Sequence, residues 1–61
     1  MAVFNREEFL ANPTLHQLDL CLKVDLYFVA NHFSIPVGST LVKRELKDAV
    51  VSGLVQRGVS S

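Results

Sequence analysis

The stretch that decides the fold runs from residue 23 to residue 54 and reads KVDLYFVANHFSIPVGSTLVKRELKDAVVSGL. Its first part has apolar residues at the spacing of one helix face, which predicts a helix from Val24 to about Phe33. The expected buried face contains Leu22, Leu26, Val29, Ala30 and Phe33. Pro36 prevents this helix from continuing, because proline has no backbone N–H and clashes with the preceding turn.

The second part predicts another helix, from about Leu41 to Arg57, joined to the first by a connector at residues 34–40. β-branched residues flank the connector proline, so we expect an extended backbone there. Ser39 or Thr40 is a suitable N-cap for the second helix, and Gly58 is a typical helix stop. The apolar stripe of this helix contains Val42, Leu46, Ala49, Val50, Gly53 and Leu54.

Two shorter elements are predicted before this stretch. Asn5 can cap a first helix within residues 1–13, and the Asn12–Pro13 pair ends that helix. Thr14 and Gln17 have the spacing of a capping box, which predicts a second short helical segment. Its apolar positions are Leu15, Leu18, Cys21 and Leu22. The pattern leaves open whether this segment ends near Leu22 or runs on into the next helix.

We therefore expect an all-α fold of three to four short helices, forming one domain over residues 1–61. Its core motif is expected at residues 23–57, with a frayed tail at residues 59–61. Domains of this size bury only about 60% of the surface that the unfolded chain exposes. Because 49% of the residues are hydrophobic, we expect apolar side chains to stay exposed and to contact a protein partner or a second copy.

The stretch resembles the helix–extended–helix unit of the SAP and LEM group of domains. The residues that carry the resemblance are Asp25-Leu26, Ala30, Phe33, Ile35-Pro36-Val37-Gly38 and Lys43-Arg44-Glu45-Leu46. In SAP domains a turn glycine precedes Lys-x-Glu-Leu, and the loop with the following helix start faces DNA. LEM domains use a comparable unit to bind a protein. Lys47 and Ala49 depart from the SAP pattern, which usually has an apolar residue at the first position and often a basic one at the second.

A second resemblance is to a segment near the N-terminus of retroelement-derived fish proteins, whose N-terminal regions look SAP-like. It rests on Leu18, Cys21, Lys23, Asp25-Leu26, Ala30, His32-Phe33 and Ile35. This resemblance implies that the chain is the N-terminal domain of a larger protein.

The formal charge is zero, with six basic and six acidic residues, whereas nucleic-acid binders usually carry a basic excess. The possible nucleic-acid-binding residues are Gly38, Ser39, Thr40, Lys43, Arg44 and Lys47. An ordinary solvated helix face, balanced by Glu45 and Asp48, is the alternative interpretation. The possible protein-interface residues lie outside the two stripes: Tyr27, Phe28, Val51 and Val55. Packing against an N-terminal segment containing Phe4, Phe9 and Leu10 is the alternative for that set.

No catalytic, cofactor-binding or metal-binding constellation is predicted. His16 and His32 have no nucleophile or metal ligand at motif spacing, and the lone Cys21 is expected to be a buried apolar residue rather than an oxidisable thiol. No apolar run reaches the ~18 residues of a membrane span, and the N-terminus lacks a signal-peptide pattern. An intracellular location, in nucleus or cytoplasm, is therefore expected, with no membrane and no small-molecule substrate. The two functional hypotheses are a protein-interaction or self-association module and a SAP-like DNA-binding module.

Overall fold

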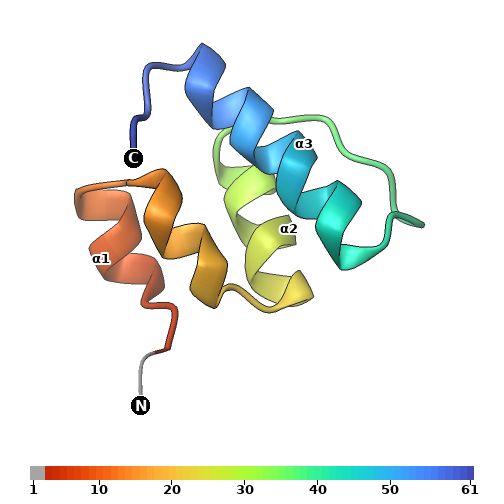
Figure 1. Cartoon of the computed structure of the whole chain (residues 1–61), viewed down its shortest axis with the longest axis horizontal. Coiled ribbons are helices and arrows are strands. Elements are labelled where there is room, and N and C mark those ends of the chain that lie inside the picture. The colour runs from red at the N-terminus through yellow and green to blue at the C-terminus, as the bar shows by residue number, and fades with distance from the viewer. Residues whose placement is uncertain (1–2) are drawn as a thin grey trace.

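Helix α2 (Lys23–His32) and helix α3 (Lys43–Gln56) lie side by side in the computed structural model, which describes residues 3–61 (Figure 1). Helix α1 (Arg6–Ala11) and the 3-10 helix η1 (Leu15–Leu20) precede them, and η1 also contacts α3. Within residues 3–61 no strand occurs. The all-α prediction with short helices is confirmed.

The start and end of α1 follow from local hydrogen bonding. The Glu8 N–H donates to Asn5 Oδ1 at 2.9 Å, which confirms the predicted N-cap, and Glu7 with Glu8 places negative charge in the first turn. The helix ends at Ala11, before the Asn12–Pro13 pair.

The next element is helical as predicted, but it is a 3-10 helix and not an α-helix. The predicted capping box is only half formed, because the Gln17 side chain accepts from the Thr14 N–H at 2.8 Å. The Thr14 hydroxyl donates to the same Gln17 oxygen at 2.9 Å instead of capping a backbone N–H. Cys21 and Leu22 then adopt extended backbone, so η1 does not run on into α2.

Both long helices end with a left-handed residue and the paired backbone bonds of a Schellman motif. After α2, Ser34 has φ 56°, and the Ile35 N–H donates to the Ala30 carbonyl at 2.8 Å. After α3, Gly58 has φ 87°, and the Val59 N–H donates back to the last turn of α3. The predicted stop at Gly58 is confirmed.

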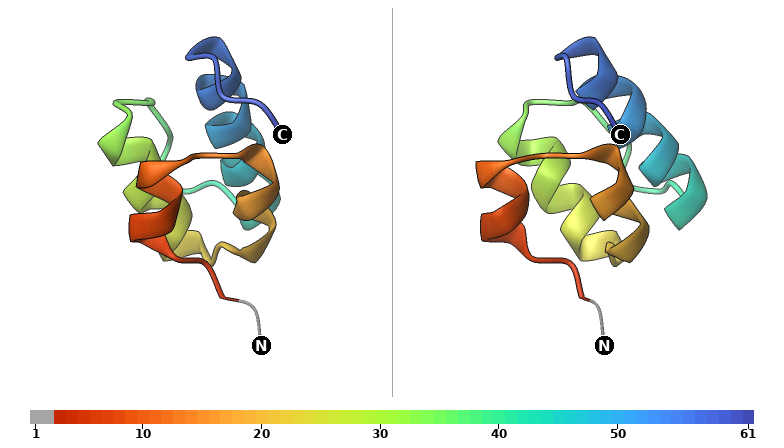
Figure 2. Two further views of the ribbon diagram at one scale, coloured as in Figure 1. Left: turned by 90° about the vertical axis from the view of Figure 1, so that its left-hand side faces the viewer. Right: turned by 60° about the vertical axis from the view of Figure 1, so that its left-hand side comes forward.

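The tail was predicted to be frayed, but residues 59 and 60 contact the rest of the domain. The Leu15 N–H donates to the Ser60 carbonyl at 3.0 Å, and Val59 packs against the core. Residues 59–60 therefore join the end of α3 to the start of η1, and Figure 2 shows the C-terminus beside that start.

The core lies between α2, η1 and α3, and Phe9 of α1 and Ile35 of the connector complete it (Figure 2). Its buried residues are Phe9, Leu18, Cys21, Leu26, Val29, Ala30, Ile35, Leu46, Val50 and Leu54. Gly53 lies on the buried face of α3 because Ile35 occupies the space beside it, and a Cβ built at Gly53 would lie 2.7 Å from three Ile35 carbons. The close contact of the connector with α3 thus depends on this glycine.

Two residues of the predicted stripes are exposed. Leu22 is 65% exposed and Val42 is 56% exposed, whereas Leu26 and Leu46, one turn further on, are fully buried. The cause is that α3 begins at Lys43, with Val42 and not Ser39 or Thr40 at the N-cap, just as Leu22 is the N-cap of α2. N-cap residues have extended backbone, so their side chains leave the helical face.

Candidate functional site

The feature that stands out is a set of exposed apolar side chains at one end of the molecule. Leu20 (43% exposed), Leu22 (65%), Val24 (61%) and Val42 (56%) lie at the end of η1 and at the starts of α2 and α3. Figures 1 and 2 show these three helix ends close together. We call these four residues the helix-start surface.

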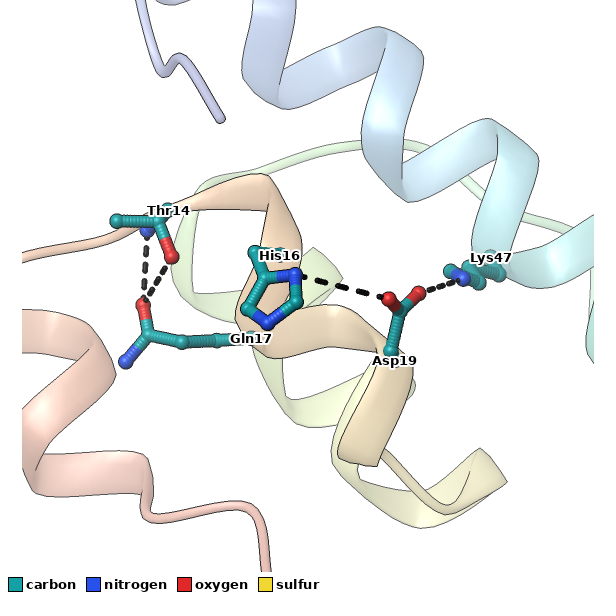
Figure 3. A network of polar contacts seen from close by, with 5 residues as sticks. All are labelled: Thr14, His16, Gln17, Asp19 and Lys47. Atoms are coloured by element: carbon teal, nitrogen blue, oxygen red, sulfur yellow. Dashed lines mark hydrogen bonds and ion pairs between the residues drawn. The ribbon is translucent and has the colours of Figure 1, made fainter.

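A polar contact joins the end of η1 to the start of α3. Lys47 in the second turn of α3 donates to Asp19 near the end of η1, and the two form an ion pair (Figure 3). That lysine lowers the pKa of the Asp19 carboxyl, by its hydrogen bond first and its charge second. Burial raises the pKa of the Cys21 thiol to about 11, and Lys43 is close enough to oppose that rise. The start of α3 therefore lies beside the segment that joins η1 to α2.

The two helices begin with the same short pattern: Leu22-Lys23-Val24-Asp25-Leu26 in α2 and Val42-Lys43-Arg44-Glu45-Leu46 in α3. In each, the acid at the third helical position accepts from the N-cap backbone N–H. The Leu22 N–H lies 3.0 Å from Asp25 Oδ2, and the Val42 N–H lies 3.4 Å from Glu45 Oε1.

Apolar N-caps make both helix starts less stable than they could be. Leucine and valine cannot accept the hydrogen bond that a serine, threonine or asparagine side chain accepts, and this costs about 1 kcal/mol per helix. Burial can offset part of this loss, since Leu22 is 65% exposed and Val42 is 56% exposed. Folding therefore gains little net stability from apolar side chains at these two positions.

Basic residues alternate with the apolar ones. Lys23, Lys43 and Arg44 are exposed in the first turns of α2 and α3, and none of them forms an ion pair with any residue from 3 to 61. Positive charge at a helix N-terminus opposes the helix dipole by about 0.3–1 kcal/mol. Two nearby acids are engaged elsewhere, since Asp25 pairs with Arg6 at 3.2 Å and Asp19 pairs with Lys47, whereas Glu45 and Asp48 are exposed in α3 without an ion pair to these cations. This end thus has three cations without a partner among the described residues.

The predicted protein-interface residues lie elsewhere. Tyr27, Phe28 and Val51 are half-buried and pack against the core. The Tyr27 hydroxyl donates to the Gly38 carbonyl at 3.2 Å, and the Arg6 guanidinium lies 4.4 Å from the centre of the Phe28 ring. Phe28 therefore contacts the N-terminal segment through Arg6. Only Val55 of the four is mostly exposed, at 52%.

The predicted nucleic-acid residues divide between two places. Gly38, Ser39 and Thr40 are exposed in the connector, while Lys43 and Arg44 lie in the first turn of α3. Lys47, the remaining member of that set, points to Asp19 (Figure 3). The structure therefore leaves two cations of the set available to an external anion.

Other chemistry finds little support in the described residues. Between residues 3 and 61 no cluster of side chains suited to a metal ion occurs. His16 is exposed, and its Nδ1 lies 3.9 Å from Asp19 Oδ2 (Figure 3). An open groove of about 300 Å³ lies between the connector and α3, and its one ionisable residue is Arg57. The Arg57 guanidinium donates to the carbonyls of Gly53 and Ser34, so it joins the end of α3 to the residue that follows α2.

Comparison with known proteins does not assign the chain to a family. No protein-family model, no curated protein and no solved structure matches it. Among the helices of residues 3–61, none is long and apolar enough to cross a membrane.

Sequence reasoning missed the helix-start surface because helical periodicity assigned Leu22 and Val42 to buried faces. The signal that could have found it is the pattern of an apolar residue, a lysine, any residue and an acid. The acid bonds back to the N-cap backbone, so its position indicates that the apolar residue is an N-cap.

Proposed function

We propose that this domain is a non-catalytic protein-interaction module that binds through the helix-start surface. The observation that carries the proposal is the pair of exposed apolar N-caps, Leu22 and Val42, at positions where the fold itself favours polar residues. Leu20 and Val24 are further exposed apolar residues at the same helix ends.

The energy available from this surface suits specific binding. Full burial of a Leu or Val side chain contributes about 1.5–3 kcal/mol, so burial of the exposed part of each contributes roughly 1 kcal/mol. Loss of two such contributions would weaken binding about thirtyfold. These residues would form the apolar centre of a small interface, with the cations at its rim.

The test separates binding from folding. The double variant L22S/V42S gives both helices a polar N-cap, so we expect it to unfold at an equal or higher urea concentration than the wild type. The wild-type domain and the variant are each used to capture proteins from the cells that produce this chain. The control variant V55S removes an exposed valine of α3 that lies outside the helix-start surface.

A protein captured by wild type and by V55S, but lost with L22S/V42S, supports the proposal. If L22S/V42S captures the same proteins as the wild type, the helix-start surface is not the interface. Light scattering of the isolated domain then shows whether a second copy is the partner, because self-association gives a mass that rises with concentration.

DNA binding is the second candidate function, and the free cations Lys43 and Arg44 favour it. It predicts an affinity for duplex DNA that falls steeply with salt and is abolished by K43E/R44E, which leaves the Lys47–Asp19 pair intact. Fluorescence anisotropy at low ionic strength measures this affinity. The absence of binding there, with no amide shift near Lys43, would eliminate this candidate.

A further inference from the structure

We infer that the partner at the helix-start surface is an acidic amphipathic segment, in which carboxylates and apolar side chains alternate. This inference rests on the proposed protein-interaction function and adds the chemistry of the partner. Its basis is charge complementarity at the surface already described.

Once internal pairs are removed, this end keeps an excess of one positive charge, because Lys23, Lys43 and Arg44 stand against the two exposed acids Glu45 and Asp48. Asp19 and Asp25 pair with Lys47 and Arg6, whereas Lys23, Lys43 and Arg44 pair with no residue between 3 and 61. The carboxylate of Glu45 faces the backbone N–H of Val42. A partner that supplies carboxylates would neutralise three cations that the fold leaves without a partner.

The order of residues indicates how the partner's groups must be arranged. Leu22, Lys23 and Val24 are consecutive, as are Val42, Lys43 and Arg44. Apolar and cationic groups therefore lie within one residue of each other on both helix starts. A ligand that satisfies both must have acidic and apolar groups interleaved at similar spacing, as on an amphipathic helix with glutamates beside its apolar stripe.

Two other occupants fit less well. In a symmetric dimer the same surface of both copies would meet, which brings Lys23, Lys43 and Arg44 of each copy together and repels them. Nucleic acid would neutralise the cations but would leave the four apolar side chains of the helix-start surface against a charged backbone.

The probe is a synthetic helical peptide with leucine at helical spacing and glutamate on both sides of the leucine stripe. One control peptide has lysine in place of every glutamate, and a second has serine in place of every leucine. Amide shifts of the labelled domain locate the contact, and a titration gives the dissociation constant. We expect the glutamate–leucine peptide to shift residues 20–24 and 42–44, with affinity that falls as salt rises.

Variants test the two components separately. L22S/V42S should weaken the peptide about thirtyfold while V55S leaves the affinity unchanged. The charge reversal K23E/K43E/R44E should lose the glutamate–leucine peptide and gain the lysine–leucine peptide. That exchange of preference cannot come from misfolding, because an unfolded variant binds neither peptide at this site.

The outcomes distinguish this inference from the proposed function. Equal binding of the glutamate and lysine peptides, with loss on L22S/V42S, overturns the acidic partner but keeps a protein interface. Stronger binding to duplex DNA or to anionic lipid vesicles than to the peptide, or a mass that doubles without peptide, also overturns it. If L22S/V42S changes neither peptide binding nor cellular capture, both the inference and the proposed function fail.

Discussion

Replacing Gly53 with alanine has two opposite effects on the stability of the domain. Gly53 lies inside α3, where alanine is favoured over glycine by about 1 kcal/mol. The added methyl group, however, would lie 2.7 Å from Cδ1, Cγ1 and Cγ2 of Ile35. This distance is well below van der Waals contact, so Ile35 or the helix must move.

Ile35 cannot move cheaply. Its side chain is β-branched and therefore restricted in rotamer, and its N–H is bonded to the Ala30 carbonyl at 2.8 Å. Overpacking a core typically costs about 1–3 kcal/mol. Subtracting the gain in helix propensity leaves a net loss of about 1 kcal/mol in the free energy of unfolding of G53A. This is a large part of the roughly 3–5 kcal/mol that the core of a domain of this size supplies.

Urea unfolding followed by circular dichroism measures the effect in a double-mutant cycle with I35A. I35A alone should cost about 2–3 kcal/mol by leaving a cavity. In that background G53A should become stabilising by about 1 kcal/mol, because the obstructing carbons are gone and the propensity gain remains. S52A, an exposed neighbour in the same helix, is the control and should stabilise by about 0.5 kcal/mol or less. A gain of about 1 kcal/mol for G53A in the wild-type background would refute the reasoning.

Three further predictions concern helix ends and ionisable groups. S34G should stabilise the domain by about 1 kcal/mol and G58S should destabilise it by a similar amount, because both positions have left-handed backbone, which favours glycine. A Cβ at residue 58 contacts no other atom, so the effect of G58S comes from the backbone alone. Thermal unfolding tests both variants, and shifts of the same sign would contradict this. Burial should keep the Cys21 thiol slow to alkylate at neutral pH until urea unfolds the chain. Because the folded state raises the pKa of that thiol, its contribution to stability is complete below its ordinary value of 9.0 and is lost as pH rises toward about 11; C21A should remove this alkaline decline. Lys47 lowers the pKa of Asp19, so the pair should stabilise the fold above the ordinary value of 3.8 and lose that effect as pH falls further; D19N should flatten this acid limb, and an unchanged limb would exclude the pair as its source.

Local chemistry allowed much of this fold to be predicted. Asn5, Pro13 and Gly58 act on backbone groups within a few residues, so the structure confirms their positions beside helix ends, and α2 ends at His32, before Pro36. The division into helices follows from the same short-range rules and from the spacing of apolar residues.

Positions set by tertiary contacts could not be predicted in this way. The start of α3 at Lys43 depends on which turn brings Leu46 into the core, and Ser39 and Thr40 offered equally good caps. The contact of Gly53 with Ile35, and the bond that holds the tail to Leu15, join residues distant in sequence. The candidate surface was missed for a related reason: a helical pattern extrapolated one residue past a helix start assigns an exposed N-cap to the core.

The bond between Leu15 and Ser60 also determines how the domain can be attached to a support or a reporter. Leu15 begins η1 and Leu20 ends it, so the two lie roughly 10 Å apart at the rise of a 3-10 helix. A dye or a biosensor linker fused after Ser61 therefore starts near Leu15, at the opposite end of η1 from Leu20 (Figure 2). Immobilisation through this terminus attaches the support at the start of η1 and not at the end of η1 that belongs to the helix-start surface.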